Sequence, residues 1–151
     1  MPAEVFAWTT RRVHTAIEGE DTAVATLRFA SGALGVIEAS TAVHPGWAQC
    51  LEICGEHGSA RLEDNQLTRW EFREEQPGDA AILAQADGAM RSGASAPNAI
   101  SHDGHRRQIQ DLIDAVREHR PPAIDGREAR KAVALVCGIY ESAARGLPVK
   151  L

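Results

Sequence analysis

Two histidines spaced three residues apart are the strongest candidates for chemistry in this sequence of 151 residues. His102 and His105 extend an apolar stripe of helical spacing that continues through Ile109, so both imidazoles are predicted to point inward from the first turn of a helix. An imidazole in that position can hydrogen-bond the hydroxyl groups of a ligand. The alternative is that His102 and His105 cap the helix and take part in packing. A zinc site is disfavoured, because the pair lacks the third ligand and the general base of a metal hydrolase.

A second candidate is the segment His44-Pro45-Gly46-Trp47, which lies between two predicted strands. An exposed Trp47 at a pocket rim could stack on a sugar ring, with His44 beside it. The alternative is a turn at the end of a strand, with the indole packed under the loop. His14 and His57 lie in polar turns, and we interpret both as solvated surface residues.

The carboxylates and thiols give weaker signals. Three glutamates could in principle supply the carboxylate pair of a glycoside hydrolase, namely Glu38, Glu52 and Glu63. The sequence gives no geometry that brings two of them together. We therefore interpret them as charges on a sheet face or at a subunit contact. The odd number of cysteines argues against a disulfide framework. Cys50 and Cys54 are predicted to share one strand face as small buried hydrophobes.

The composition is that of one globular domain spanning residues 1–151. Hydrophobic residues make up 44% and charged residues 25%, so the chain can bury a core without a disulfide or metal. The net charge is −5, with lysine only at Lys131 and Lys150, which disfavours a nucleic-acid partner. No apolar run approaches the roughly 20 residues of a membrane helix, and no signal peptide is recognisable, so we expect no membrane partner and a cytoplasmic protein.

The first half of the chain is predicted to form β structure. Short turns separate the strands, which indicates antiparallel pairing because parallel strands need long crossovers. Gly32 supplies the positive φ of one hairpin turn. Several strands are apolar or small on both faces, so we expect helices over one face and a partner subunit over much of the other. The expected strands are 3–13, 22–29, 33–42, 47–54, 59–63 and 67–74.

Two helices are predicted to close the chain. A long loop over residues 76–100, with a short helix near 79–87, precedes a helix over 102–119. The last helix starts at Asp125, where Asp125 and Glu128 resemble a capping box, and ends at a C′ glycine, Gly146. The fold class is therefore α+β, a mostly antiparallel open sheet of about six strands with two C-terminal helices packed on one face.

Three segments carry a family resemblance: EDTAVATLRFASGALGVIEAS at 20–40, LEICGEHGSARLED at 51–64, and residues 101–149 from SHDGHRRQIQ to AARGLPV. Together they resemble the C-terminal domain of the Gfo/Idh/MocA oxidoreductases, the family of glucose-fructose oxidoreductase and inositol dehydrogenase. The resemblance implies a full-length enzyme whose N-terminal Rossmann domain binds NAD or NADP. It further implies a domain that lines the pocket for a sugar or polyol, with the region of His102 and His105 approaching the substrate, and that forms homo-oligomers through its sheet face.

The catalytic motifs of that family are missing from this sequence. There is no G-x-G-x-x-G to hold a pyrophosphate at a helix N-terminus, and Gly55-x-x-Gly58 is too short. Neither lysine lies in the family's E-K-P motif, and no aspartate has a histidine four residues later. We therefore expect this chain to bind no cofactor and to be inactive alone, as an excised domain or truncated product.

Three functions are compatible with these observations. The first is a substrate-lining and oligomerisation domain of an NAD(P)-dependent oxidoreductase that acts on a sugar, inositol or related polyol. The second is a stand-alone, non-catalytic dimerisation module. An independent hydrolase is the least supported of the three, because it would require the chain alone to turn over a sugar derivative.

Overall fold

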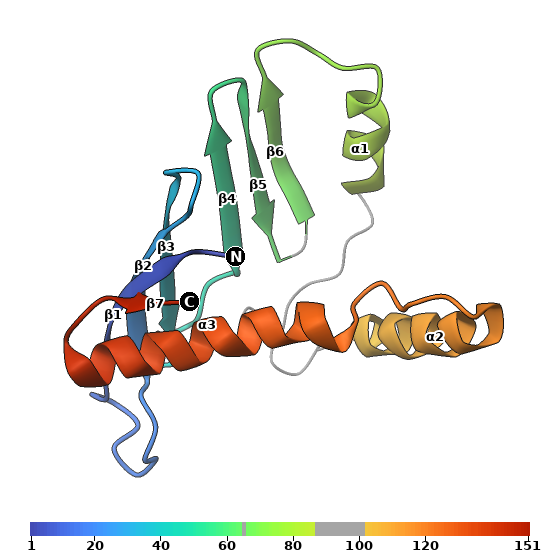
Figure 1. The fold of residues 1–151 in the computed structure, drawn as a ribbon. Coiled ribbons are helices and arrows are strands. Elements are labelled where there is room, and N and C mark those ends of the chain that lie inside the picture. Colours follow the sequence, from blue (N-terminus) through green and yellow to red (C-terminus); the bar gives the residue numbers. More distant parts are fainter. Residues whose placement is uncertain (65, 87–101) are drawn as a thin grey trace. The chain divides into compact units, whose positions relative to one another are not determined.

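The computed structural model describes residues 1–64, 66–86 and 102–151, and in it the chain forms two units. One unit combines residues 1–43 with residues 110–151, and the other comprises residues 44–109. Both are drawn in Figure 1. The first unit therefore joins the two ends of the sequence, whereas the second is continuous.

The first unit is built on a four-stranded antiparallel sheet. Its strands follow the order β3-β2-β1-β7. Val5 lies opposite Leu27, and Ala25 lies opposite Ile37. Gly32 turns the chain between two of these strands with a φ of 88°, as the sequence predicted. The strands are β1 (Glu4–Thr10), β2 (Thr22–Arg28), β3 (Leu34–Ser40) and β7 (Val149–Lys150).

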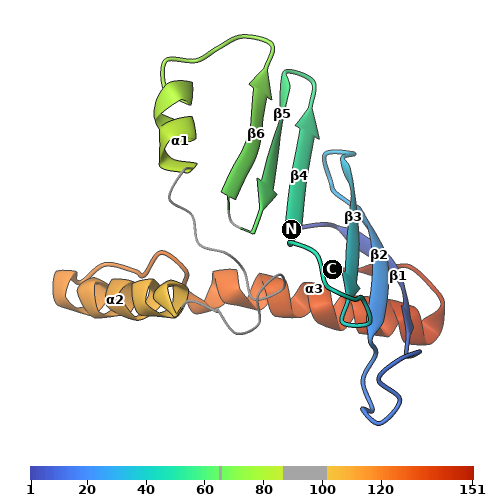
Figure 2. The same ribbon diagram turned by 180° about the vertical axis from the view of Figure 1, so that it is seen from behind.

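One face of this sheet is covered by α3 (Gly126–Arg145), which lies across it in both views (Figures 1 and 2). The helix begins where the Asp125 carboxylate accepts backbone hydrogen bonds from Arg127 and Glu128, and ends at Gly146 with a φ of 65°. Both caps agree with the sequence. The buried core between helix and sheet consists of Val5, Ala7, Ala25, Leu27 and Val149, flanked by Leu135 and Ile139.

The second unit contains a three-stranded antiparallel sheet of order β4-β5-β6, with α1 (Asp79–Ala86) packed beside β6. Gly58 begins the middle strand at a close approach. A Cβ there would lie 2.3 Å from the Phe72 ring and 2.6 Å from the Glu71 carbonyl oxygen, so only glycine fits. The strands are β4 (Cys50–Gly55), β5 (Gly58–Glu63) and β6 (Gln66–Phe72).

The remaining helix, α2 (Asp103–Glu118), connects to α3 through a corner organised by Asp111. The Asp111 carboxylate accepts a hydrogen bond from the Ala123 amide at 2.7 Å and pairs with the Arg120 guanidinium at 2.9 Å. Asp125 then caps α3. Pro121 and Pro122 lie in this turn, where neither residue could continue α2 as a regular helix.

The structure confirms the α+β class and corrects three details. The predicted single six-stranded sheet is wrong, because the described strands form sheets of four and three, and the two-residue β7 was not predicted. α1 confirms the short helix predicted near 79–87, but α2 does not pack on a described strand as α3 does. The cysteines are exposed rather than buried. The part of the predicted 76–100 loop from residue 87 onward lies outside the described residues.

Candidate functional site

The four predicted ligand-binding side chains are all exposed. His44 and Trp47 lie on the segment that leads into β4, and 84% of the Trp47 surface is accessible to solvent. The indole is therefore not packed under its loop, which rules out that alternative. His102 and His105 lie at the start of α2, also in solvent. The prediction that both imidazoles point inward is therefore wrong, and neither packs into a core. Among the described residues, the structure shows no side-chain hydrogen bond or ring contact that joins these four residues.

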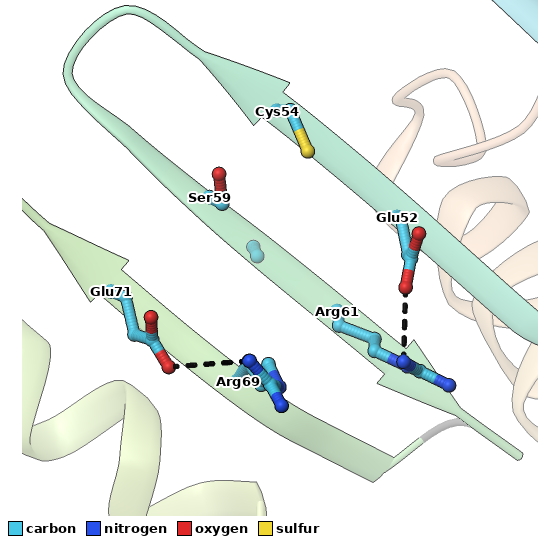
Figure 3. A pocket seen from close by; sticks show the side chains of 7 residues that line it. Glu52, Cys54, Ser59, Arg61, Arg69 and Glu71 are labelled. Carbon is cyan, nitrogen blue, oxygen red and sulfur yellow. Dashed lines mark ion pairs between the residues drawn. The ribbon is translucent and has the colours of Figure 1, made fainter.

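A polar depression of about 370 Å³ lies on one face of the three-stranded sheet. Figure 3 shows Glu52 from β4, Arg61 from β5, and Arg69 with Glu71 from β6 around it, together with Cys54 and Ser59. The cross-strand register explains the grouping, since Glu52 is opposite Arg61 and Arg61 is opposite Arg69. Residues on the other face are mostly apolar, so this sheet has one charged and one apolar face.

Arg61 is the centre of this charged face. Its guanidinium pairs with Glu52 at 3.0 Å and with Glu63 at 2.5 Å. Desolvation lowers the Arg61 pKa, but the electrostatic influence of Cys50 and of the two carboxylates outweighs it, so the pKa rises above its usual value. One guanidinium thus holds both carboxylates. This arrangement supports a charged sheet face and gives no support to Glu52 and Glu63 as an acid and base.

Sequence reasoning named Glu52 and Glu63 but missed Arg61 and Arg69. The signal was available as an alternation of period two. In β5, polar residues alternate with smaller or apolar ones. This alternation places Ser59, Arg61 and Glu63 on one face of the strand.

A second polar cluster, in the first unit, orders the connection between β1 and β2. The Asp21 carboxylate is 3% exposed and accepts hydrogen bonds from the amides of Val13, Arg12 and His14, at 2.6, 2.7 and 3.1 Å. The bond from Val13 is the largest influence, and together these bonds lower the Asp21 pKa to about 2, although burial opposes them. These bonds join the carboxylate to the backbone of the connection, so the cluster orders the loop.

Neither cluster resembles a metal or dinucleotide site. In residues 1–64, 66–86 and 102–151, no group of three or more His, Cys, Asp or Glu side chains could hold a metal ion. Gly55 and Gly58 flank the tight β4–β5 turn rather than a strand-to-helix loop, so the backbone there cannot cradle a pyrophosphate. Among the helices that the structure describes, none is long and apolar enough to cross a membrane.

Comparison with known proteins identifies the protein family in which such a domain occurs. The family model described as "Oxidoreductase family, C-terminal alpha/beta domain" matches residues 1–151. The myo-inositol 2-dehydrogenase of Thermotoga maritima is 30% identical over 131 residues, which cover 87% of this chain and 36% of that protein.

Solved structures give the same result. The WlbA dehydrogenase from Bordetella pertussis, in complex with NADH and UDP-GlcNAcA, superposes with a TM-score of 0.82 at 30% identity, over 99% of this chain and 42% of that one. The WlbA enzyme from Chromobacterium violaceum, with the same ligands, gives 0.80 at 28% identity, over 99% and 40%. The chain thus spans less than half the length of these relatives. It belongs to the Gfo/Idh/MocA oxidoreductase family, whose C-terminal alpha/beta domain it represents.

Proposed function

We propose that this chain is the substrate-lining and oligomerisation domain of an NAD(P)-dependent oxidoreductase that acts on a sugar, inositol or related polyol. The observation that carries the proposal is the family match over residues 1–151. The curated relative is an inositol dehydrogenase, and the WlbA structures hold NADH and a nucleotide-linked sugar acid. The relatives are nearly equally identical in sequence to this chain but differ in substrate. We therefore propose only a class of substrate, the polyhydroxylated compounds.

The cofactor would be bound outside this domain. The sequence has no G-x-G-x-x-G, and the described residues provide no helix N-terminus behind a glycine-rich turn. When bound to the rest of the protein, the nicotinamide would accept or donate the hydride. The residues present here would bind and orient the substrate.

Four exposed side chains would supply that binding. His102 and His105 can hydrogen-bond sugar hydroxyls through their ring nitrogens, and the exposed Trp47 indole can stack on the apolar face of a sugar ring beside His44. Their exposure supports this role, because none of the four is occupied by a side-chain hydrogen bond in the described residues. The His105→Ala substitution in the full-length enzyme should raise KM or lower kcat, whereas the control substitution His57→Ala, in the β4–β5 turn, should do neither. Unchanged kinetics for His105→Ala would refute its role.

The homo-oligomer would form through contacts at the open face of the four-stranded sheet. Opposite the face that α3 covers, Phe6 and Trp8 stack edge to face with centroids 4.4 Å apart. On the same face Trp8 is 59%, Val24 37% and Val36 72% exposed. Contiguous apolar surface of this kind marks interaction sites, and a twofold interface uses the same patch on both subunits.

The oligomer is testable with one substitution. Val36→Asp places a charge within the proposed interface, so the assembly should dissociate to monomers in sedimentation velocity. Because Val36 is exposed in the single chain, the fold itself should lose no more than about 0.5 kcal/mol. Glu18→Lys, on the β1–β2 loop, is the matched surface control. A wild-type monomer at micromolar concentration, or an intact Val36→Asp oligomer, would refute this interface.

A further inference from the structure

The position of Trp47, one of the candidate substrate contacts, depends on the backbone of its segment. The indole is 84% exposed, and among the described residues it makes no ring contact. Within the described part of the chain, the hydrogen bonds of residues 44–49 are both made with one residue, Asp64. What holds the Trp47 ring in place is therefore the attachment of this segment to Asp64.

Asp64 binds both backbone groups of Gln49. Its amide donates to the Gln49 carbonyl at 2.9 Å, and its carboxylate Oδ1 accepts a hydrogen bond from the Gln49 amide at 3.1 Å. Because Cys50 of β4 lies opposite Glu63 of β5, Gln49 and Asp64 form the next pair of the antiparallel ladder. In a regular ladder the backbone carbonyl of Asp64 would accept the Gln49 amide. Here the carboxylate of the same residue takes over that role.

The backbone conformation of Asp64 explains why a carboxylate is needed. Asp64 has a φ of 48°, which lies in the left-handed region and ends the regular strand after Glu63. Aspartate tolerates this region because its short side chain can hydrogen-bond the nearby backbone. Glycine would adopt the same φ but has no acceptor, and alanine also lacks the acceptor. Aspartate thus supplies both the turn and the second hydrogen bond to Gln49.

We propose that Asp64 is a positioning residue for the substrate, because its carboxylate fixes the segment that presents Trp47 to a sugar or polyol ring. The proposal rests on the proposed function, in which Trp47 contacts the substrate. Trp47 lies only two residues before Gln49, and all three residues belong to the unit of residues 44–109. A ring that is held in place before binding loses less conformational freedom when the substrate stacks on it.

Steady-state kinetics of the full-length enzyme test this role. The probe is whichever of myo-inositol, glucose and UDP-GlcNAcA the wild type oxidises fastest. Asp64→Gly keeps the left-handed φ accessible and removes the acceptor. We expect its KM for the probe to rise about threefold to tenfold, the range of one aromatic stacking contact. The kcat should stay within about twofold, because the lost contact is made equally in the ground state and the transition state.

Three further substitutions isolate the hydrogen bond. Asp64→Asn retains a side-chain oxygen and the tolerance of left-handed φ, so it should keep the wild-type KM. Asp64→Ala also lacks the acceptor and should raise KM as Asp64→Gly does, which provides a second removal variant should glycine loosen the fold. Asp79→Gly is the matched control. It removes another carboxylate that accepts a backbone amide, from Gln76 at 2.8 Å, and should leave KM unchanged.

A double variant separates positioning from a purely structural role. If Asp64 acts through Trp47, Asp64→Gly should raise KM no further in a Trp47→Ala background. Additive effects in the double variant would overturn the positioning role and leave the proposed function standing. So would a raised KM in Trp47→Ala beside an unchanged KM in Asp64→Gly and Asp64→Ala, or a KM in Asp64→Asn as high as in Asp64→Gly. An unchanged KM in Trp47→Ala, or no oxidation of any of the three probes, would instead refute the proposed function and the role of Asp64 with it.

Discussion

Replacing Ser142 with alanine should remove a large share of the stability of this domain. Ser142 is fully buried on α3. Its Oγ accepts a hydrogen bond from the Ala7 amide of β1 at 3.0 Å and donates one to the Leu147 carbonyl at 2.7 Å. One hydroxyl thus ties the central helix to a strand and to the chain that follows the helix.

The cost follows from the two backbone groups that alanine would leave without this partner. An orphaned buried donor or acceptor costs about 1–3 kcal/mol. Leu147 is 53% exposed, so water can partly replace the hydroxyl at its carbonyl, and we expect a total loss of about 2–4 kcal/mol. Domains of this size are stable by only about 5–15 kcal/mol.

Urea unfolding followed by circular dichroism measures this loss. The Ser142→Ala midpoint should fall while the slope m stays unchanged, because the surface exposed on unfolding is the same. Ser31→Ala is the matched control. Ser31 is exposed, and its Oγ lies 3.4 Å from the Ala33 amide in a hairpin turn, so its loss should stay within about 0.5 kcal/mol. Equal midpoints for the two variants would refute the reasoning.

Two further predictions concern ionisable groups of the first unit. Asp21 has a pKa of about 2 in the folded state, against an ordinary value of 3.8. The folded state therefore binds fewer protons than the unfolded state. The stability that Asp21 contributes is complete above pH 3.8 and is lost as the pH falls toward 2. Asp21→Asn should remove this part of the acid dependence in urea titrations at several pH values; an identical profile would contradict the assignment. Tyr140 is the single tyrosine of the chain, and its hydroxyl donates to Glu20 at 2.8 Å, which raises the Tyr140 pKa. Its phenolate absorbance should therefore appear at higher pH than in Glu20→Gln, and coincident titration curves would argue against the bond.

Local features of the fold were predictable because short-range chemistry sets them. The Asp125 cap, the Gly146 terminus and the Gly32 turn depend on a few neighbouring residues, and each appears where the sequence placed it. The approximate positions of six strands follow from β-branched runs between turn residues.

Pairing partners and covering surfaces were less accessible to sequence reasoning. Which strands share a sheet depends on contacts far apart in the chain, so β7 beside β1 and the separation into two sheets were missed. The stripe of α2 predicted an amphipathic helix correctly, but periodicity does not identify what covers the apolar side. The Arg61 cluster was missed because it depends on strand pairing, which brings Glu52 of β4 and Arg69 of β6 to either side of Arg61.

We propose that this domain contributes substrate contacts and assembly, while cofactor binding belongs to the remainder of the enzyme. Titration of this 151-residue chain with NADH and NADPH, followed by nicotinamide fluorescence, tests it most directly. We expect no saturable binding and no oxidation of inositol or other polyols by the chain alone. Tight, saturable binding of either nucleotide, together with polyol oxidation, would contradict it.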